Sequence, residues 1–170
     1  MRKEIFKMAM YRKLGKATKP RRALLRNQVT ALLYNGKIIT TEARAKEIKK
    51  IVEPMITLAA KEKDKDGKRV KEVVDGKKVT KYTTVKKEIK KDLPSRMHAR
   101  RQLLKTLYPV TEVPTENAGR KKNTKEVDLV AKLFDEYGPK YADRKGGYTR
   151  MIKIGQRKGD AAMMVVLELV

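Results

Sequence analysis

Residues 20–60 read PRRALLRNQVTALLYNGKIITTEARAKEIKKIVEPMITLAA, and this stretch decides the fold. Its first part predicts a helix over residues 20–34, because the apolar positions share one helical face. These positions are Leu25, Val29, Leu32 and Leu33. Gly36 can end the helix in the left-handed conformation that glycine adopts without strain. Residues 37–40 favour a short strand.

The second half of this stretch predicts another helix that begins after Thr41. Thr41 is a suitable N-cap, and Glu42 places an acid in the positive first turn. The apolar stripe of this helix consists of Ala45, Ile48, Val52, Met55, Ile56 and Ala59. Pro54 removes one backbone hydrogen bond, which costs about 3 kcal/mol unless the helix bends, so a kink is predicted near Ile51.

The remaining chain predicts two more helices and a hairpin. Ser95, after Pro94, is expected to cap a third helix, and residues 110–123 are expected to form a loop. Asn123 and Glu126 resemble a capping box that opens a fourth helix, which should end at Gly138-Pro139. Residues 148–154 and 163–169 are rich in strand formers and predict an antiparallel hairpin around the loop 155–160. The fold class is therefore α+β, with helices packed on a small mixed or antiparallel sheet in one domain over residues 20–170.

Two charged segments accompany this domain. A basic N-terminal arm spans residues 1–19, and the first 26 residues together hold ten basic side chains and one acid, Glu4. Such an arm cannot fold alone, so we expect it to become ordered against phosphates. Residues 63–93 form an insertion rich in Lys and Asp, where Asp75-Gly76 predicts a type I′ turn between strands 70–74 and 77–85. Disorder is the alternative for this charged hairpin.

Composition limits the function. The net charge is +24, from 44 Lys and Arg against 20 Asp and Glu, which favours a polyanionic partner. The absence of Cys and the single His exclude disulfides and the common zinc sites, so no metal or cofactor is predicted. No phosphate-binding loop occurs, and the one serine looks like a helix cap, so we predict neither an enzyme nor a small-molecule substrate. The chain has no secretory signal and no apolar run that suits a membrane, which predicts a cytoplasmic location.

The predicted RNA contacts are basic side chains, with two tyrosines and the one histidine among them. They are Tyr11, Arg12, Lys13, Lys16, Lys19, Arg21, Arg22, Arg26, Arg44, Lys46, Arg96, His98, Arg100, Arg101, Arg144, Tyr148, Arg150, Arg157 and Lys158. His98 is expected to face RNA or solvent, with a packed histidine as the alternative. Tyr11, Tyr141 and Tyr148 could stack on unpaired bases or could equally be tyrosines at the edge of the core.

Several blocks of sequence resemble one known family. They are Tyr11-Arg12-Lys13-Leu14-Gly15, Ala23-Leu24-Leu25-Arg26-Asn27, residues 39–47, residues 133–141, residues 144–150 and residues 155–162. In this order they resemble the bacterial ribosomal protein L17 family, over residues 11–61, 95–108 and 125–170. The resemblance implies an α+β fold, a structural role on large-subunit ribosomal RNA beside neighbouring ribosomal proteins, and a position near the nascent-chain exit. The family pattern lacks the insertion and has proline at the position of Met163. The pattern begins near Met8, so translation could start at Met1 or at Met8.

Two other classes share the charge. A DNA-compacting nucleoid protein would normally offer a dimer face or a recognition helix, and an RNA-modifying enzyme would need a nucleotide or methyl-donor pocket. Neither feature is found in the sequence. We therefore expect a protein that recognises folded RNA by its shape and contacts its phosphates.

Overall fold

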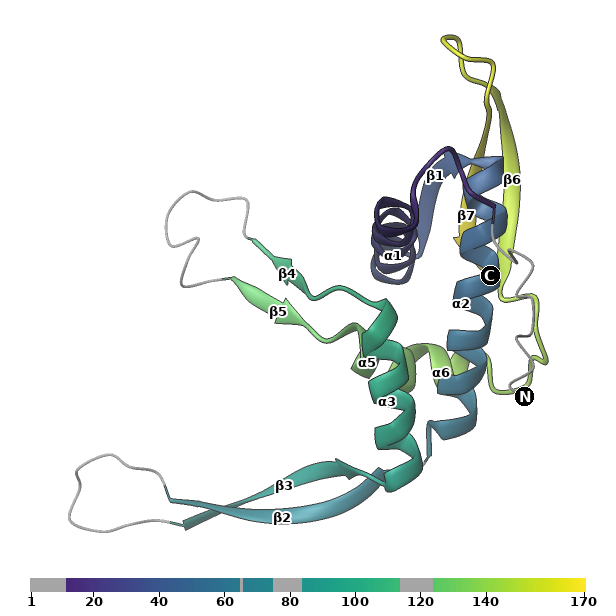
Figure 1. The fold of residues 1–170 in the computed structure, drawn as a ribbon. Coiled ribbons are helices and arrows are strands. Elements are labelled where there is room, and N and C mark those ends of the chain that lie inside the picture. Colours follow the sequence, from purple (N-terminus) through teal and green to yellow (C-terminus); the bar gives the residue numbers. More distant parts are fainter. Residues whose placement is uncertain (1–11, 65, 75–83, 114–123) are drawn as a thin grey trace, which may run out of the picture.

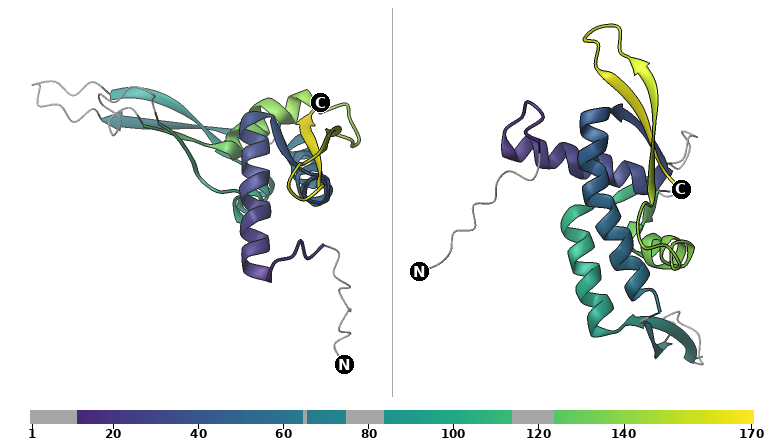
Figure 2. Two further views of the ribbon diagram at one scale, coloured as in Figure 1. Left: turned by 90° about the horizontal axis from the view of Figure 1, so that it is seen from above. Right: turned by 90° about the vertical axis from the view of Figure 1, so that its right-hand side faces the viewer.

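The computed structural model describes residues 12–64, 66–74, 84–113 and 124–170, and for 66–74 and 84–91 the backbone alone. Three helices form the body: α1 (Thr18–Asn35), α2 (Glu42–Glu62) and α3 (Pro94–Thr106). Figure 1 shows α3 beside the lower half of α2, and the right-hand view of Figure 2 shows α1 running across α2. A helical segment follows later in the chain, as α5 (Leu129–Lys132), the π-helical turn η1 (Leu133–Tyr137) and α6 (Gly138–Lys140). None of the helices in the described part of the chain is long and apolar enough to cross a membrane.

The main sheet has three antiparallel strands in the order β1-β7-β6. These are β1 (Lys37–Thr41), β6 (Thr149–Gln156) and β7 (Met163–Leu169), as the sequence predicts. The central strand β7 contributes Val165 and Leu167 to the core, and both side chains are fully buried. Together with the helices this confirms the α+β fold.

The helix stripes of residues 20–60 are confirmed. Leu25, Val29, Leu32 and Leu33 are all buried, and so is the whole predicted stripe of α2. Gly36 has φ 77° and its N–H donates to the Leu32 carbonyl at 2.8 Å, so it ends α1 as expected. Thr41 occupies the N-cap of α2, but its side chain makes no capping hydrogen bond. α2 is assigned as one helix through Pro54, and the bend near Ile51 stays a prediction.

Two predicted helix starts are wrong. α3 begins at Pro94 with Leu93 as its N-cap, because proline suits the first helical position, where an N–H group would have no partner in the helix. The capping box at Asn123 and Glu126 does not open a helix. Instead β5 (Lys125–Val127) pairs with β4 (Val110–Glu112), inside the expected loop, and Asn123 lies outside the described residues. Asp128 is the actual cap of α5, since its Oδ1 accepts from the N–H groups of Val130 at 2.9 Å and Ala131 at 3.0 Å.

The fourth helix also ends later than expected, because the helical segment continues through Gly138-Pro139 to Lys140. Gly138 packs against the end of α2, where a Cβ atom would lie 3.0 Å from Lys63 Cβ and 3.3 Å from the Ala59 carbonyl oxygen. Any larger residue at this position would crowd the end of α2, so glycine suits the close approach of the two segments.

The insertion is an antiparallel hairpin of β2 (Asp66–Val74) and β3 (Thr84–Asp92), which extends away from the body in Figures 1 and 2. This confirms the predicted charged hairpin. Its register is different, because Val74 pairs with Thr84, whereas a two-residue turn at 75–76 would pair Val74 with Lys77. Asp75 and Gly76 themselves lie outside the described residues.

Candidate nucleic-acid interface

A basic cleft lies at the N-terminal end of α2. It has a volume of about 460 Å³ and is lined by cations from three separate segments: Arg12 of the arm, Arg44 and Lys46 of α2, and Arg157 of the β6–β7 loop. The structure thus brings together four predicted contacts that lie up to 145 positions apart. The first turn of a long helix adds its own partial positive charge to this end.

Two acids also line this cleft. Lys46 Nζ lies 2.7 Å from Glu42 Oε1, and this hydrogen bond and the charge of Lys46 lower the pKa of Glu42. Arg157 Nε donates to Asp160 Oδ1 at 2.9 Å, and the pKa of Asp160 falls to about 2 because of this hydrogen bond. Both acids are therefore ionised at neutral pH, so four cations against two acids leave the cleft with two net positive charges. Arg44 is the cleft cation without an acidic partner among the described residues.

The described part of the arm is docked on the body. Arg12 Nε lies 3.7 Å from Oε1 of Glu47, an acid of α2 whose side chain is fully buried. Leu14 packs against the core and forms a tight turn with Gly15, at φ 54° and φ 64°. The Lys16 N–H closes this turn on the Lys13 carbonyl at 3.1 Å. The arm therefore reaches the cleft in a defined conformation from Arg12 onward.

A second basic surface lies at the start of α1. Lys16, Lys19 and Arg22 are exposed, and Arg21 is partly so. Arg21 and Arg22 border a shallow pocket of about 280 Å³ together with Lys105, at the C-terminal end of α3. The five cations have no acidic partner within the described part of the chain. We call this set, Lys16, Lys19, Arg21, Arg22 and Lys105, the α1 surface.

Three functional candidates were missed by the sequence analysis. Lys105 belongs to the α1 surface, and Lys61 and Lys145 line a groove of about 770 Å³ along α2 beside Pro54. For Lys61 the signal was present, because Lys50, Pro54, Thr57 and Lys61 follow one another on a single helical face. Lys145 stands in the same turn as Arg144.

Arg26 holds the body together. Its Nε donates to the Thr106 carbonyl and its Nη2 to the Leu107 carbonyl, both at 3.0 Å, and its guanidinium lies 4.1 Å from the centre of the Tyr108 ring. These bonds satisfy carbonyls at the end of α3. These donors of Arg26 therefore serve the chain itself, and its contact with RNA stays a prediction.

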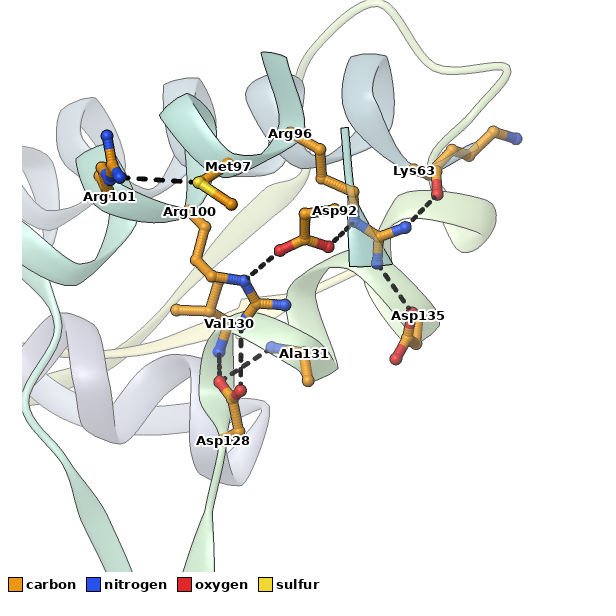
Figure 3. A network of polar contacts seen from close by, with 10 residues as sticks. All are labelled: Lys63, Asp92, Arg96, Met97, Arg100, Arg101, Asp128, Val130, Ala131 and Asp135. Carbon is orange, nitrogen blue, oxygen red and sulfur yellow. Dashed lines mark hydrogen bonds and ion pairs between the residues drawn. The ribbon is translucent and has the colours of Figure 1, made fainter. Parts of the chain in front are cut away.

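Arg96 and Arg100 form the network of Figure 3, which connects the base of the insertion to α3 and α5. Arg96 is 4% exposed. Its Nη1 donates to the Lys63 carbonyl at 2.9 Å, its Nη2 to Asp135 at 3.3 Å, and its Nε lies 3.1 Å from Asp92. Arg100 Nε donates to Asp92 at 2.6 Å and its Nη1 to Asp128 at 3.0 Å. Arg96 and Arg100 therefore have structural partners within the chain, and RNA contacts through them stay predictions.

The other predicted contacts on α3 are exposed. His98 and Arg101 lie on its outer face, where the His98 ring is 2.8 Å from Gln102 Nε2 and Arg101 Nη2 is 3.6 Å from the sulfur of Met97. The packed alternative for His98 is thereby excluded. Arg144, Arg157 and Lys158 are exposed too.

Tyr141 and Tyr148 belong to the core. Tyr148 is 1% exposed, and its hydroxyl donates to the Arg144 carbonyl at 3.0 Å. Tyr141 is 2% exposed and its hydroxyl donates to the Val170 carbonyl at 2.6 Å. For Tyr141 and Tyr148 the burial therefore supports the alternative of a core position, while Tyr11 lies outside the described residues. Arg150 is bound to Glu168, to which its Nε donates at 2.7 Å.

Comparison with known proteins identifies the family. The family model described as ribosomal protein L17 matches residues 24–170. The chain is 67% identical to the large ribosomal subunit protein bL17 of Lachnospira eligens, in an alignment that covers 96% of this chain and all of the relative. The corresponding proteins of Acetivibrio thermocellus and Clostridium botulinum are 44% and 41% identical with the same coverage. The chain therefore belongs to the bacterial ribosomal protein L17 family, the structural, non-enzymatic constituents of the large ribosomal subunit.

Proposed function

We propose that this chain binds large-subunit ribosomal RNA through phosphate contacts and thereby supports assembly of the subunit in the cytoplasm. The observation that carries this proposal is the cleft at the N-terminal end of α2, where cations from three distant segments converge. The family resemblance implies that the binding site lies near the nascent-chain exit.

Most of the proposed contacts are predicted cations whose side chains reach the surface, and Lys105 of the α1 surface is added to them. They come from the cleft, the arm, the α1 surface, the outer face of α3 and the C-terminal loops: Arg12, Lys13, Lys16, Lys19, Arg21, Arg22, Arg44, Lys46, Arg101, Lys105, Arg144, Arg157 and Lys158. His98 lies beside Arg101 and belongs to the same face. Because side chains cannot read the narrow major groove of A-form RNA, this arrangement recognises the shape of the RNA backbone.

The salt dependence of binding tests the phosphate model. Neutralisation of roughly six to ten phosphates is expected to weaken binding about 10³- to 10⁵-fold between 50 and 200 mM salt. The measurement is filter binding of the purified chain to large-subunit RNA across this range. A B-form DNA duplex of matched length is the control, since equal affinity for both would support a nucleoid protein. A flat salt profile would contradict the model.

Beyond its base, the insertion should be dispensable for folding and for RNA binding. Removal of residues 69–89, with Lys68 joined to its partner Lys90 through Asn-Gly, keeps the first pairs of the hairpin. We expect the unfolding free energy to change by less than about 0.5 kcal/mol, because Lys63 and Asp92 both remain and keep their contacts with Arg96. RNA affinity should fall no more than a few-fold.

Deletion of the whole segment 63–93 is the informative comparison. It removes two partners of Arg96 and should lower the melting temperature, as measured by circular dichroism. A large loss of RNA affinity in the shorter deletion would instead make the hairpin part of the RNA interface.

A further inference from the structure

One face of the main sheet carries an exposed apolar row. The register places Ile39 of β1, Val166 of β7 and Ile152 of β6 directly side by side. They point away from the buried Val165 and Leu167, because neighbouring residues of a strand face opposite sides of the sheet. Ile39 is 67% exposed and Ile152 44%. Ile154, at the irregularity of β6, has no partner in the register and is 58% exposed.

Helix α2 covers the other face of this sheet, as the right-hand view of Figure 2 shows. The core side chains therefore lie between the sheet and α2, and the row of Ile39, Val166 and Ile152 takes no part in that core. Directly opposite side chains on adjacent strands contact one another, so the three form one continuous aliphatic strip across the sheet. We call it the outer strip.

The charge next to the outer strip is nearly balanced. The adjacent row of the register is Lys37, Glu168 and Arg150, and Arg150 is hydrogen-bonded to Glu168. Two cations and one acid leave one positive charge here, on a chain whose net charge is +24. On the other side of the strip, Thr41 and Met164 are uncharged. This face therefore differs from the surfaces that suit phosphates.

We infer that the outer strip is the docking site of a neighbouring protein of the large subunit, which presents aliphatic side chains and an acid opposite Lys37. Aliphatic side chains give phosphates nothing to bind, whereas apolar burial is the main source of protein–protein association. A second copy is disfavoured, since two chains of +24 repel each other and a stable dimer buries about 800 Å² on each partner. The inference rests on the proposed function, which it extends from RNA to a protein partner.

The test uses intact large subunits that contain the full chain with a photoreactive amino acid in place of Ile152. After irradiation, the adduct should survive ribonuclease, and mass spectrometry should find it on a peptide of one other subunit protein with aliphatic and acidic residues. An adduct with a nucleotide, with this chain itself or with a second copy, or the absence of an adduct, overturns the inference.

A probe at Arg22 on the α1 surface is the matched control, because it should form an adduct with RNA. A protein adduct at 152 together with no RNA adduct at 22 would contradict the proposed function and leave the docking site standing. The reverse pattern would contradict only the docking site.

A second variant measures the contribution of the strip. The double substitution Ile39→Thr with Ile152→Thr keeps β-branched residues, so the isolated chain should retain its melting temperature and RNA affinity. Its retention on subunits during washing at high salt should fall at least several-fold. Retention equal to that of the parent chain would overturn the inference.

Discussion

Replacement of Arg96 by Met is expected to lower the free energy of unfolding by about 3 kcal/mol, near the lower end of the range for a broken buried ion pair. The side chain of Arg96 is almost fully buried, and it serves the Lys63 carbonyl, Asp92 and Asp135 together. Methionine has a similar length but leaves these groups without the guanidinium. Asp92 keeps its contact with Arg100, which is why the expected loss is not larger.

Thermal unfolding followed by circular dichroism measures this effect, as a fall of roughly 10 °C in Tm for a chain of this size. Arg101→Met is the matched control, because Arg101 lies on the same helix with an exposed side chain, and its Tm should change little. Equal stability of the two variants would show that the network of Figure 3 does not stabilise the fold.

The double substitution Arg21→Glu with Arg22→Glu is expected to weaken binding to large-subunit RNA by on the order of 100-fold or more at low salt, because it replaces two phosphate contacts with two repulsions. The far-ultraviolet circular dichroism spectrum should stay unchanged, since both residues lie in the first turns of α1, where acids suit the helix dipole. Incorporation into subunits should be lost.

A control with the same change in net charge separates local contacts from overall charge. Lys125→Glu with Lys140→Glu reverses two exposed cations on β5 and α6, away from the α1 surface and the cleft. Its affinity for RNA should remain within about tenfold of the parent chain. If both double variants lose affinity equally, the α1 surface is not a specific contact.

The elements with strong local signals could be predicted from the sequence. The stripes of α1 and α2, the glycine stop at Gly36 and the strands β6 and β7 are all confirmed. Each of these elements depends on hydrophobic periodicity or on the conformational freedom of one residue. Both signals come from residues that lie close together in the sequence. The predicted helix starts were wrong where the local sequence fitted more than one structure. Asn123 and Glu126 fit a capping box, but strand pairing between β4 and β5 prevailed and moved the cap to Asp128.

The candidate site was harder to predict, because the role of an arginine depends on its partners in the fold. Arg96 and Arg100 stood in a basic stretch, yet Asp92 precedes Arg96 by four positions, the spacing of ion pairs along a helix, and Arg100 follows after four more. That pattern could have identified their structural role. Nothing local could have shown that Arg12, Arg44 and Arg157 line one cleft, since only the packing of the arm and the β6–β7 loop on α2 brings them together.

The position of β7 has a consequence for synthesis of the chain. It is the central strand of the main sheet, and both β1 and β6 pair with it, but it is the last strand in chain order. During translation β1 is made early and must wait for residues 163–169 before it has a partner. The main sheet therefore forms only after residues 163–169 have been made, and a chain that stops before Met163 has neither the main sheet nor the outer strip. Fragments left by premature termination would then be excluded from assembly by their failure to fold, without a separate mechanism to recognise them.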